Sequence, residues 1–188
     1  ENASLAEAYR QALACDPVST FGGVLAFNRK LDAETAAEVA KLFAECIVAP
    51  GYDAGALAAL AGKKNLRLLD IVMNKGTGEH AEGEGWQLKP ISGGILVQDA
   101  DRHVLSEADL KVATKRAPTR EELDGLMFGW KVAKHVKSNA IVFVRGGRTL
   151  GVGAGQMSRV DSVKIAVMKA QQPLAGSVVA SDAFFPFP

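Results

Sequence analysis

The chain has 188 residues, 48% of them apolar by a wide count, and its 22 basic residues nearly balance 21 acidic ones. This length suits one domain or two small ones, and a formal net charge of +1 argues against a general nucleic-acid binder, which usually carries a basic excess. The apolar content argues against a disordered chain, and no apolar run approaches the roughly 18 to 20 residues of a membrane span. We therefore expect a cytoplasmic globular protein that binds neither nucleic acid nor a membrane.

The first half alternates between predicted helices and strands. Its helices begin at a Ser or an Asp, whose side-chain oxygens accept hydrogen bonds from backbone N–H groups of the first helical turn. Short apolar runs between the helices are typical of buried strands. In chain order the pattern predicts a helix at 4–15, a strand at 24–27, a helix at 32–44, a strand at 47–48, a helix at 53–60 and a strand at 66–72.

Residues 74–89 differ from the sequence on either side of them. Four glycines stand among charged residues there, which predicts a mobile loop or a linker between two subdomains. Further along, a capping box from Thr119 to Glu122 begins a long helix, and Gly146-Gly147 is typical of a hairpin turn. The second half is predicted to contain a strand at 94–97, a helix at 119–137, strands at 140–144 and 149–152, a helix at 158–169 and a strand at 178–180.

This alternation predicts an α/β fold with mixed sheets, since the hairpin is antiparallel. Its repetition on both sides of the linker suggests two related subdomains, at 1–73 and at 90–188. The chain has no initiating Met and ends on the apolar stretch 183–188, whereas termini are normally polar. We therefore expect a fragment of a longer protein, incomplete at the amino end of the first subdomain and at the carboxyl end of the second.

Two stretches of the second half are candidates for ligand binding. Asn139 follows the long helix directly, and its amide, which donates and accepts, can either cap local backbone groups or face a ligand. The glycine-rich run Gly151–Gly155 matches neither a P-loop nor a dinucleotide fingerprint, and by spacing alone it is typical of a plain turn. However, a helix with Arg159 near its start follows, and the N–H groups of a helix start attract anions.

Two further stretches leave alternatives open. Ser19–Gly23 is typical of a helix-to-strand turn, although paired glycines also allow close approach of a ligand. Ser181–Phe187 places three phenylalanines around a proline, which suits either a hydrophobic plug or an aromatic wall for a flat ligand. Two cysteines and three histidines have no metal-ligand spacing and no order typical of a catalytic triad. Lys134-His135 lies within a predicted helix, where adjacent side chains diverge by about 100°, so a surface pair is expected.

The order and spacing of these stretches resemble the transformylase part of the AICAR transformylase/IMP cyclohydrolase family. The resemblance covers nearly the whole chain. It is carried by Asp16–Gly23, Ile47–Tyr52, Lys137–Ala140, Gly151–Arg159 and Ser181–Phe187.

The resemblance implies a cytidine-deaminase-like α/β fold without zinc, in a homodimer whose active sites are shared between chains. It also implies a reaction, the transfer of a formyl group from 10-formyltetrahydrofolate to the 5-amino group of AICAR. That amine is a poor nucleophile, because its lone pair is delocalised into the imidazole and the carboxamide. Catalysis therefore requires orientation, proton transfer and stabilisation of the charge on a tetrahedral intermediate.

Roles for individual residues follow from the resemblance alone. Asn139 matches a catalytic Asn that positions the reacting groups. The sequence leaves open whether Asp182 and Ser138 help to hold a structural cation, for which potassium is the candidate ion. The expected AICAR contacts are Phe21, Gly22, Glu45 and Arg159, and the expected folate contacts are Val160 and Phe184.

Parts of the family pattern are not in this sequence. A Lys-His pair that transfers the proton is expected just before Glu1, and a substrate-binding Arg and the cyclohydrolase domain are also missing. We therefore expect the chain alone to be nearly inactive, although its parent carries both activities. One alternative is a degenerate or truncated non-catalytic module that binds a nucleotide or serves assembly. Another is a generic phosphate-binding module, which rests only on Gly151–Arg159.

Overall fold

The computed structural model describes residues 1–71 and 86–185. Contacts between Cα atoms divide the chain into two units, one formed by Glu1–Ile71 with Val112–Pro188 and the other by Val72–Lys111. The first unit holds two separate three-stranded sheets, and the second holds a two-stranded sheet. The subdomain boundaries predicted from the sequence stay predictions.

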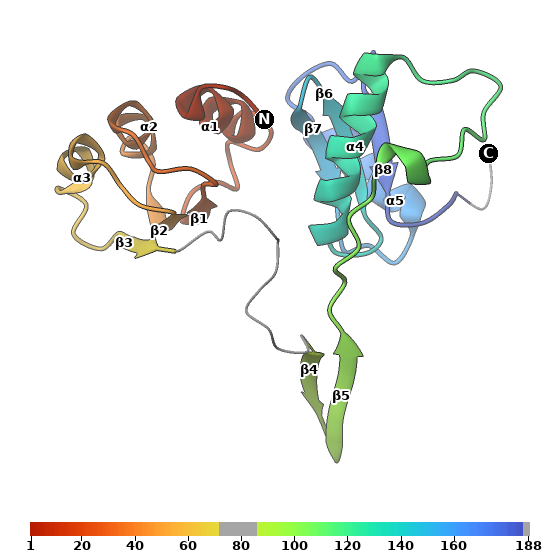
Figure 1. Ribbon diagram of the computed structural model, residues 1–188, viewed down its shortest axis with the longest axis horizontal. Helices are drawn as coiled ribbons and strands as arrows, with labels where there is room; N and C mark the ends of the chain where they lie inside the picture. The colour runs from red at the N-terminus through yellow and green to blue at the C-terminus, as the bar shows by residue number, and fades with distance from the viewer. Residues whose placement is uncertain (72–85, 186–188) are drawn as a thin grey trace. The chain divides into compact units, whose positions relative to one another are not determined.

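The first sheet is parallel, in the strand order β1-β2-β3, and a helix joins each strand to the next. Figure 1 shows the three helices of this region on the same side of the sheet. Its elements are α1 (Leu5–Leu13), β1 (Gly23–Ala26), α2 (Ala33–Val39), β2 (Ala44–Ala49), α3 (Ala54–Leu60) and β3 (Arg67–Asp70).

The three helices begin at the predicted capping residues. The side chains of Ser4, Asp32 and Asp53 each accept a hydrogen bond from the backbone N–H three residues further on. The helix predicted at 32–44 is wrong at its end, because α2 stops at Val39 and Ala44 already begins β2. Residues 40–43 form a turn between α2 and β2, and from Ala44 onward pairing with β1 outweighs a local preference for helix.

The core of this region lies between the helices and one face of the sheet. Leu31, Val39 and Ile47 are fully enclosed there. The opposite face remains exposed, although it is apolar: Val24 is 68% exposed and Leu69 is 50% exposed. Parallel sheets are usually covered on both faces, so this half-covered sheet is unusual.

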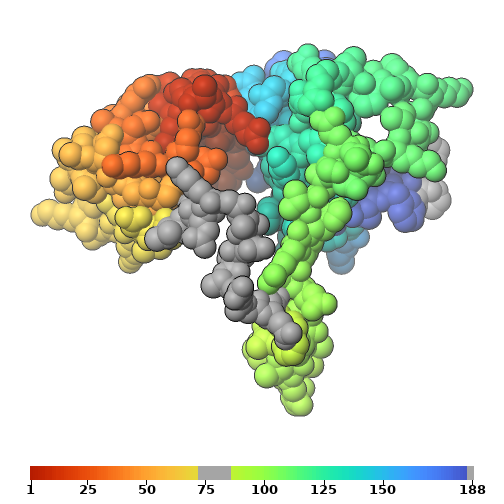
Figure 2. Space-filling model, viewed as in Figure 1, coloured from red at the N-terminus to blue at the C-terminus, as the bar shows by residue number. Residues whose placement is uncertain are grey.

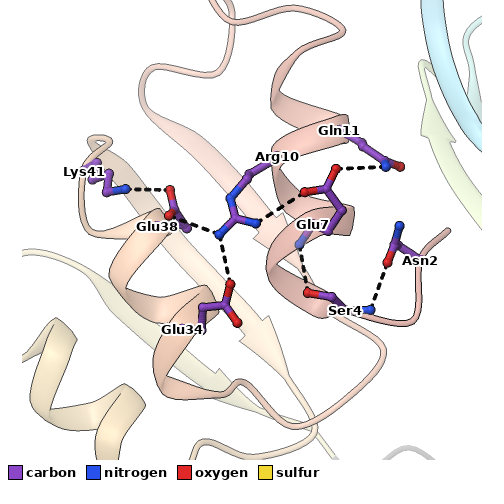
Figure 3. Close-up of polar contacts among 8 residues, drawn as sticks. All are labelled: Asn2, Ser4, Glu7, Arg10, Gln11, Glu34, Glu38 and Lys41. Atoms are coloured by element: carbon purple, nitrogen blue, oxygen red, sulfur yellow. Dashed lines mark hydrogen bonds and ion pairs between the residues drawn. The ribbon is translucent and has the colours of Figure 1, made fainter.

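A charged network joins α1 to α2 (Figure 3). The guanidinium of Arg10 donates to Glu7 on its own helix and to Glu34 and Glu38 on α2, at 2.9 to 3.3 Å. Lys41 adds a second cation beside Glu38. All these side chains are partly exposed, so the network orients the two helices more than it stabilises them.

The second sheet is antiparallel, in the strand order β7-β6-β8, and both of its faces are covered. In Figure 1, α4 crosses one face of it and α5 lies against the other. The predicted hairpin is confirmed, with Gly146 and Gly147 at φ of 58° and 68°. The elements are α4 (Arg120–His135), β6 (Ile141–Arg145), β7 (Arg148–Gly153), α5 (Arg159–Lys169) and β8 (Val178–Ser181).

Glycines allow both helices to approach this sheet closely. A Cβ at Gly129 of α4 would lie 3.1 Å from Ala180. On the other face, a Cβ at Gly151 would lie 2.4 Å from the carbonyl oxygen of Ala166, and one at Gly153 only 1.8 Å from that of Ser162. Gly151 and Gly153 therefore serve strand–helix packing within β7. Only the end of the run is turn-like, since Gly155, at a φ of 69°, lies in the bend that follows β7.

The second unit contains a hairpin of β4 (Trp86–Ile91) and β5 (Gly94–Asp99) and a short 3₁₀ helix, η1 (Glu107–Asp109). Residues 86–89, assigned to a loop from their sequence, are therefore part of a strand, while 74–85 lie outside the described residues. Register places Trp86, Leu88, Ile95 and Val97 on one face, where each is more than half exposed. Figure 2 shows the atoms of this hairpin in yellow-green.

The predicted fold class is confirmed as mixed α/β with parallel and antiparallel sheets. Within residues 1–71 and 86–185, no helix combines the length and apolar character that crossing a bilayer requires.

Candidate functional site

The order of the second sheet brings three sequence motifs together. Both β7 and β8 run antiparallel to the central strand β6, so their carboxyl ends meet its amino end. Ile141 pairs with Gly153 on one side and with Ser181 on the other. The residues just before β6, just after β7 and at the end of β8 therefore share one corner, which we call the Asn139 corner.

Asn139 is held in a single orientation at this corner. Its Nδ2 donates to the backbone carbonyls of Gln156 at 2.8 Å and Met157 at 3.1 Å, and its Oδ1 accepts from Arg159 at 2.8 Å. Its own carbonyl oxygen accepts from the buried hydroxyl of Ser162 at 2.8 Å. A flipped amide would set its NH₂ against the guanidinium, so the hydrogen bonds define which end is oxygen.

Arg159, the first residue of α5, is the centre of the corner. Its Nη1 donates to Ser181 Oγ at 2.7 Å and to Asp182 Oδ1 at 2.5 Å, while Nη2 donates to Asn139. The side chain is only 12% exposed. A guanidinium has five N–H donors, so Nε–H and one N–H of Nη2 remain for a ligand after these contacts with the described residues.

Asp182 neutralises Arg159 and also binds the backbone just before β6. Its Oδ1 also accepts from the Ala140 N–H at 3.0 Å. Burial acts to raise the pKa of Asp182, but hydrogen bonds from Arg159, Ser138 and the Ala140 N–H outweigh it and lower the pKa to about 2. The carboxyl group is therefore ionised at neutral pH and does not act as a proton donor there.

The two expected folate contacts lie close to the corner in sequence but point to solvent. Val160 is 57% exposed and Phe184 is 81% exposed, and Met157 beside Asn139 is fully exposed. Exposed apolar side chains next to a polar cluster suit a flat ligand that has an aromatic ring and a polar edge. Their assignment to folate stays a prediction.

The expected contacts of the first half form a second group. Phe21 and Gly22 precede β1, and Glu45 lies at the start of the neighbouring parallel strand β2. The Gly22 N–H donates to the Phe43 carbonyl at 2.8 Å, and the rings of Phe21 and Phe43 pack with centroids 5.1 Å apart. The structure therefore brings these three predicted residues together at the amino ends of β1 and β2.

The chemistry of this second group is less specific than that of the Asn139 corner. Glu45 pairs with Arg67 at 3.1 Å, and both side chains are largely exposed. Parallel sheets bind ligands at the carboxyl ends of their strands, whereas these residues lie at the amino ends. Their role as AICAR contacts therefore rests on the family resemblance.

The expectation of a structural potassium ion at Asp182 and Ser138 stays a prediction. The carboxylate of Asp182 is already occupied by Arg159, Ser138 and the Ala140 N–H, and a guanidinium at 2.5 Å repels a second cation. In the part of the chain that the structure describes, no group of three or more His, Cys, Asp or Glu side chains is placed to hold a metal ion.

Sequence reasoning found Asn139 and Arg159 but missed what joins them. Ser181 and Asp182 lie 22 and 23 residues beyond Arg159, and their pairing with it depends on β8 lying beside β6. In the sequence, the only signal of this contact was the polar pair Ser181-Asp182 at the end of a predicted strand. Lys134 and His135, interpreted as a surface pair, are exposed near the end of α4.

Comparison with known proteins assigns the family. A family model described as the AICARFT/IMPCHase bienzyme matches residues 1–169. The chain belongs to the AICARFT/IMPCHase bienzyme family. The resemblance found in its motifs is therefore confirmed.

Curated relatives within the AICARFT/IMPCHase family share more than half of the residues. The bifunctional purine biosynthesis protein PurH of Anaeromyxobacter sp. is 56% identical over 185 residues, which are 97% of this chain and 35% of that protein. The PurH proteins of Chelativorans sp. and Rhodospirillum rubrum are 55% and 52% identical, and each alignment covers all of this chain. The chain thus spans about a third of the length of these AICARFT/IMPCHase relatives.

Proposed function

We propose that this chain forms part of the site for formyl transfer from 10-formyltetrahydrofolate to the 5-amino group of AICAR. Membership of a family of bifunctional purine biosynthesis proteins supports a role in that pathway. The observation that carries the proposal is the Asn139 corner, where Asn139 and Arg159, chosen from their sequence as catalytic and substrate-binding residues, hydrogen-bond to each other.

The corner supplies orientation and charge stabilisation for this reaction. Arg159 donates to the Asn139 carbonyl oxygen, which polarises the amide and fixes the direction in which it faces a substrate. The unused Nε–H and Nη2 donors of Arg159 can contact an anionic or carbonyl group of AICAR. Exposed Phe184 and Val160 supply apolar surface for the pterin ring of the folate.

Proton transfer needs a group that the described corner does not contain. Asp182 is ionised and already bonded, and Asn and Arg do not exchange protons at neutral pH. The proposed reaction therefore uses the chain's residues to bind and orient both substrates, and a base from elsewhere in the complete protein removes the proton. We further propose a cytidine-deaminase-like fold in two related subdomains, a homodimer with shared active sites, and a cytoplasmic location.

The test is the steady-state rate of formyl transfer by the complete natural protein that contains this chain. Asn139→Ala should lower kcat by about 100-fold or more with an unchanged circular dichroism spectrum. Arg159→Ala should raise the KM for AICAR, since it removes a substrate contact. Near-normal turnover of Asn139→Ala would contradict the proposal.

The alternative of a non-catalytic nucleotide-binding or assembly module predicts a different result. It predicts that the complete protein binds AICAR in a calorimetric titration but transfers no formyl group. A generic phosphate-binding module would bind AICAR and inorganic phosphate alike and would not bind the folate.

A further inference from the structure

Asp182 lies at the outer end of a chain of hydrogen bonds that leads to Asn139. The chain begins at the Ala140 N–H and the Asp182 carboxylate, passes through the Arg159 guanidinium and ends at the Asn139 Oδ1. Each link is between 2.5 and 3.0 Å long, and the Asp182 side chain is only 24% exposed. No role at the site follows for Asp182 from the family resemblance beyond possible cation binding.

The geometry of Arg159 explains why the carboxylate matters. Nη1 has two hydrogens, and Asp182 and Ser181 accept one each, so the plane of the guanidinium is fixed on that side. Only in that plane does Nη2 point at Asn139. A carboxylate is the stronger of the two acceptors, because a bond between two charged groups is about twice as strong as a neutral one.

Asn139 in turn depends on Arg159 for one half of its orientation. Its NH₂ is held by two backbone carbonyls, but Arg159 is the only described side chain that donates to its oxygen. Movement of the guanidinium would leave this oxygen without its charged donor and free the amide to tilt. A misplacement of about 1 Å at a reacting centre can cost about 100-fold in rate.

We propose that Asp182 is a positioning residue, whose carboxylate fixes Arg159 and, through it, the Asn139 carboxamide that faces the substrates. This inference rests on the proposed function. The amide oxygen of Asp182→Asn can still accept from the Ala140 N–H, so the loss of the carboxylate charge acts mainly through Arg159. This substitution therefore lowers the rate when Arg159 is present and adds little when Arg159 is absent.

The kinetic test uses the complete natural protein. Asp182→Asn keeps the size of the side chain but removes its charge, and we expect kcat per folded molecule to fall by about 10- to 100-fold. The melting temperature should also fall at neutral pH, because the ion pair with Arg159 is lost. Asp182→Glu keeps the charge but moves the carboxylate by one methylene, so its kcat should fall less than that of Asp182→Asn. Asp161→Asn is the matched control, because Asp161 pairs with Lys164 on the exposed side of α5 and should leave kcat unchanged.

A double-mutant cycle separates positioning from mere structural support. Arg159→Ala combined with Asp182→Asn should be no slower than Arg159→Ala alone, since the second change removes a partner that is already lost. The proposal would be overturned if the losses of activity in the two single variants added in full in the double variant. It would also be overturned if Asp182→Asn kept the wild-type kcat per folded molecule.

A second readout does not depend on catalysis. In a crystal structure of the Asp182→Asn variant, the Arg159 guanidinium should have rotated and its bond to Asn139 Oδ1 should be broken. If the bond remains at its present 2.8 Å, Asp182 does not position Asn139. If the wild-type protein transfers no formyl group, the proposed function fails, but this structure still decides the role of Asp182.

Discussion

The two three-stranded sheets of the larger unit differ in how many of their faces are covered by helices. The parallel sheet β1-β2-β3 carries all its helices on one face, whereas the antiparallel sheet β7-β6-β8 has α4 and α5 on opposite faces. Val142 and Val144 of the second sheet are fully buried, while Val24 of the first is 68% exposed. The same residue type thus contributes very different amounts to stability, according to whether a helix covers it.

The largest effect is expected where α5 approaches the second sheet most closely. A Cβ at Gly153 would lie 1.8 Å from the Ser162 carbonyl, so Gly153→Ala forces the helix away from β7 and should cost at least about 3 kcal/mol. Urea unfolding followed by circular dichroism measures the loss. Gly62→Ala in the first half is the control, since nothing lies within 4 Å of its added methyl group, and a similar loss there would contradict the explanation.

Valine truncations test the difference in cover directly. Val142→Ala should cost about 2 kcal/mol, because a fully buried valine side chain loses its apolar contacts. Val24→Ala should change the unfolding free energy by no more than about 0.5 kcal/mol, because the side chain is already largely in solvent. A large loss for Val24→Ala in the complete protein would show that the exposed face of the first sheet is covered there.

Acid should weaken the second sheet through Asp182. The pKa of this carboxyl group is lowered from 3.8 to about 2 in the folded protein, so its stabilising effect is present above about pH 4 and is lost as the pH falls toward 2. We expect the melting temperature to fall in that window. In Asp182→Asn this part of the fall should be absent, and an identical pH profile for the two proteins would contradict the assignment.

The smallest effect is expected in the first half, at the charged network on its surface. Arg10→Met removes the cation shared by Glu7, Glu34 and Glu38 but keeps most of the apolar stem. The melting temperature should fall slightly, and the difference from wild type should shrink in about 1 M salt, where exposed charges are screened. A loss that does not depend on salt would indicate that packing, not charge, is the cause.

Short sequence signals such as capping residues predicted where helices begin, but they did not predict where every helix ends or where every strand forms. The Asp53 cap and the Thr119–Glu122 capping box gave the correct starts of α3 and α4, because a cap needs only atoms within one helical turn. The end of α2 and the whole of β4 were missed, because a strand forms where a partner strand is available. Residues 44 and 86–89 are strand because β1 and β5 lie beside them.

The candidate site also depends partly on local sequence and partly on contacts between distant segments. Motifs along the chain are enough to assign the family, the types of residue at the site, and Asn139 and Arg159 as candidates. That Asp182 holds Arg159, and that Arg159 holds Asn139, follows from the packing of the strands and cannot be predicted from those motifs. The reason is topological: β7 and β8 both run antiparallel to β6, and this alone brings segments about 20 residues apart to one corner.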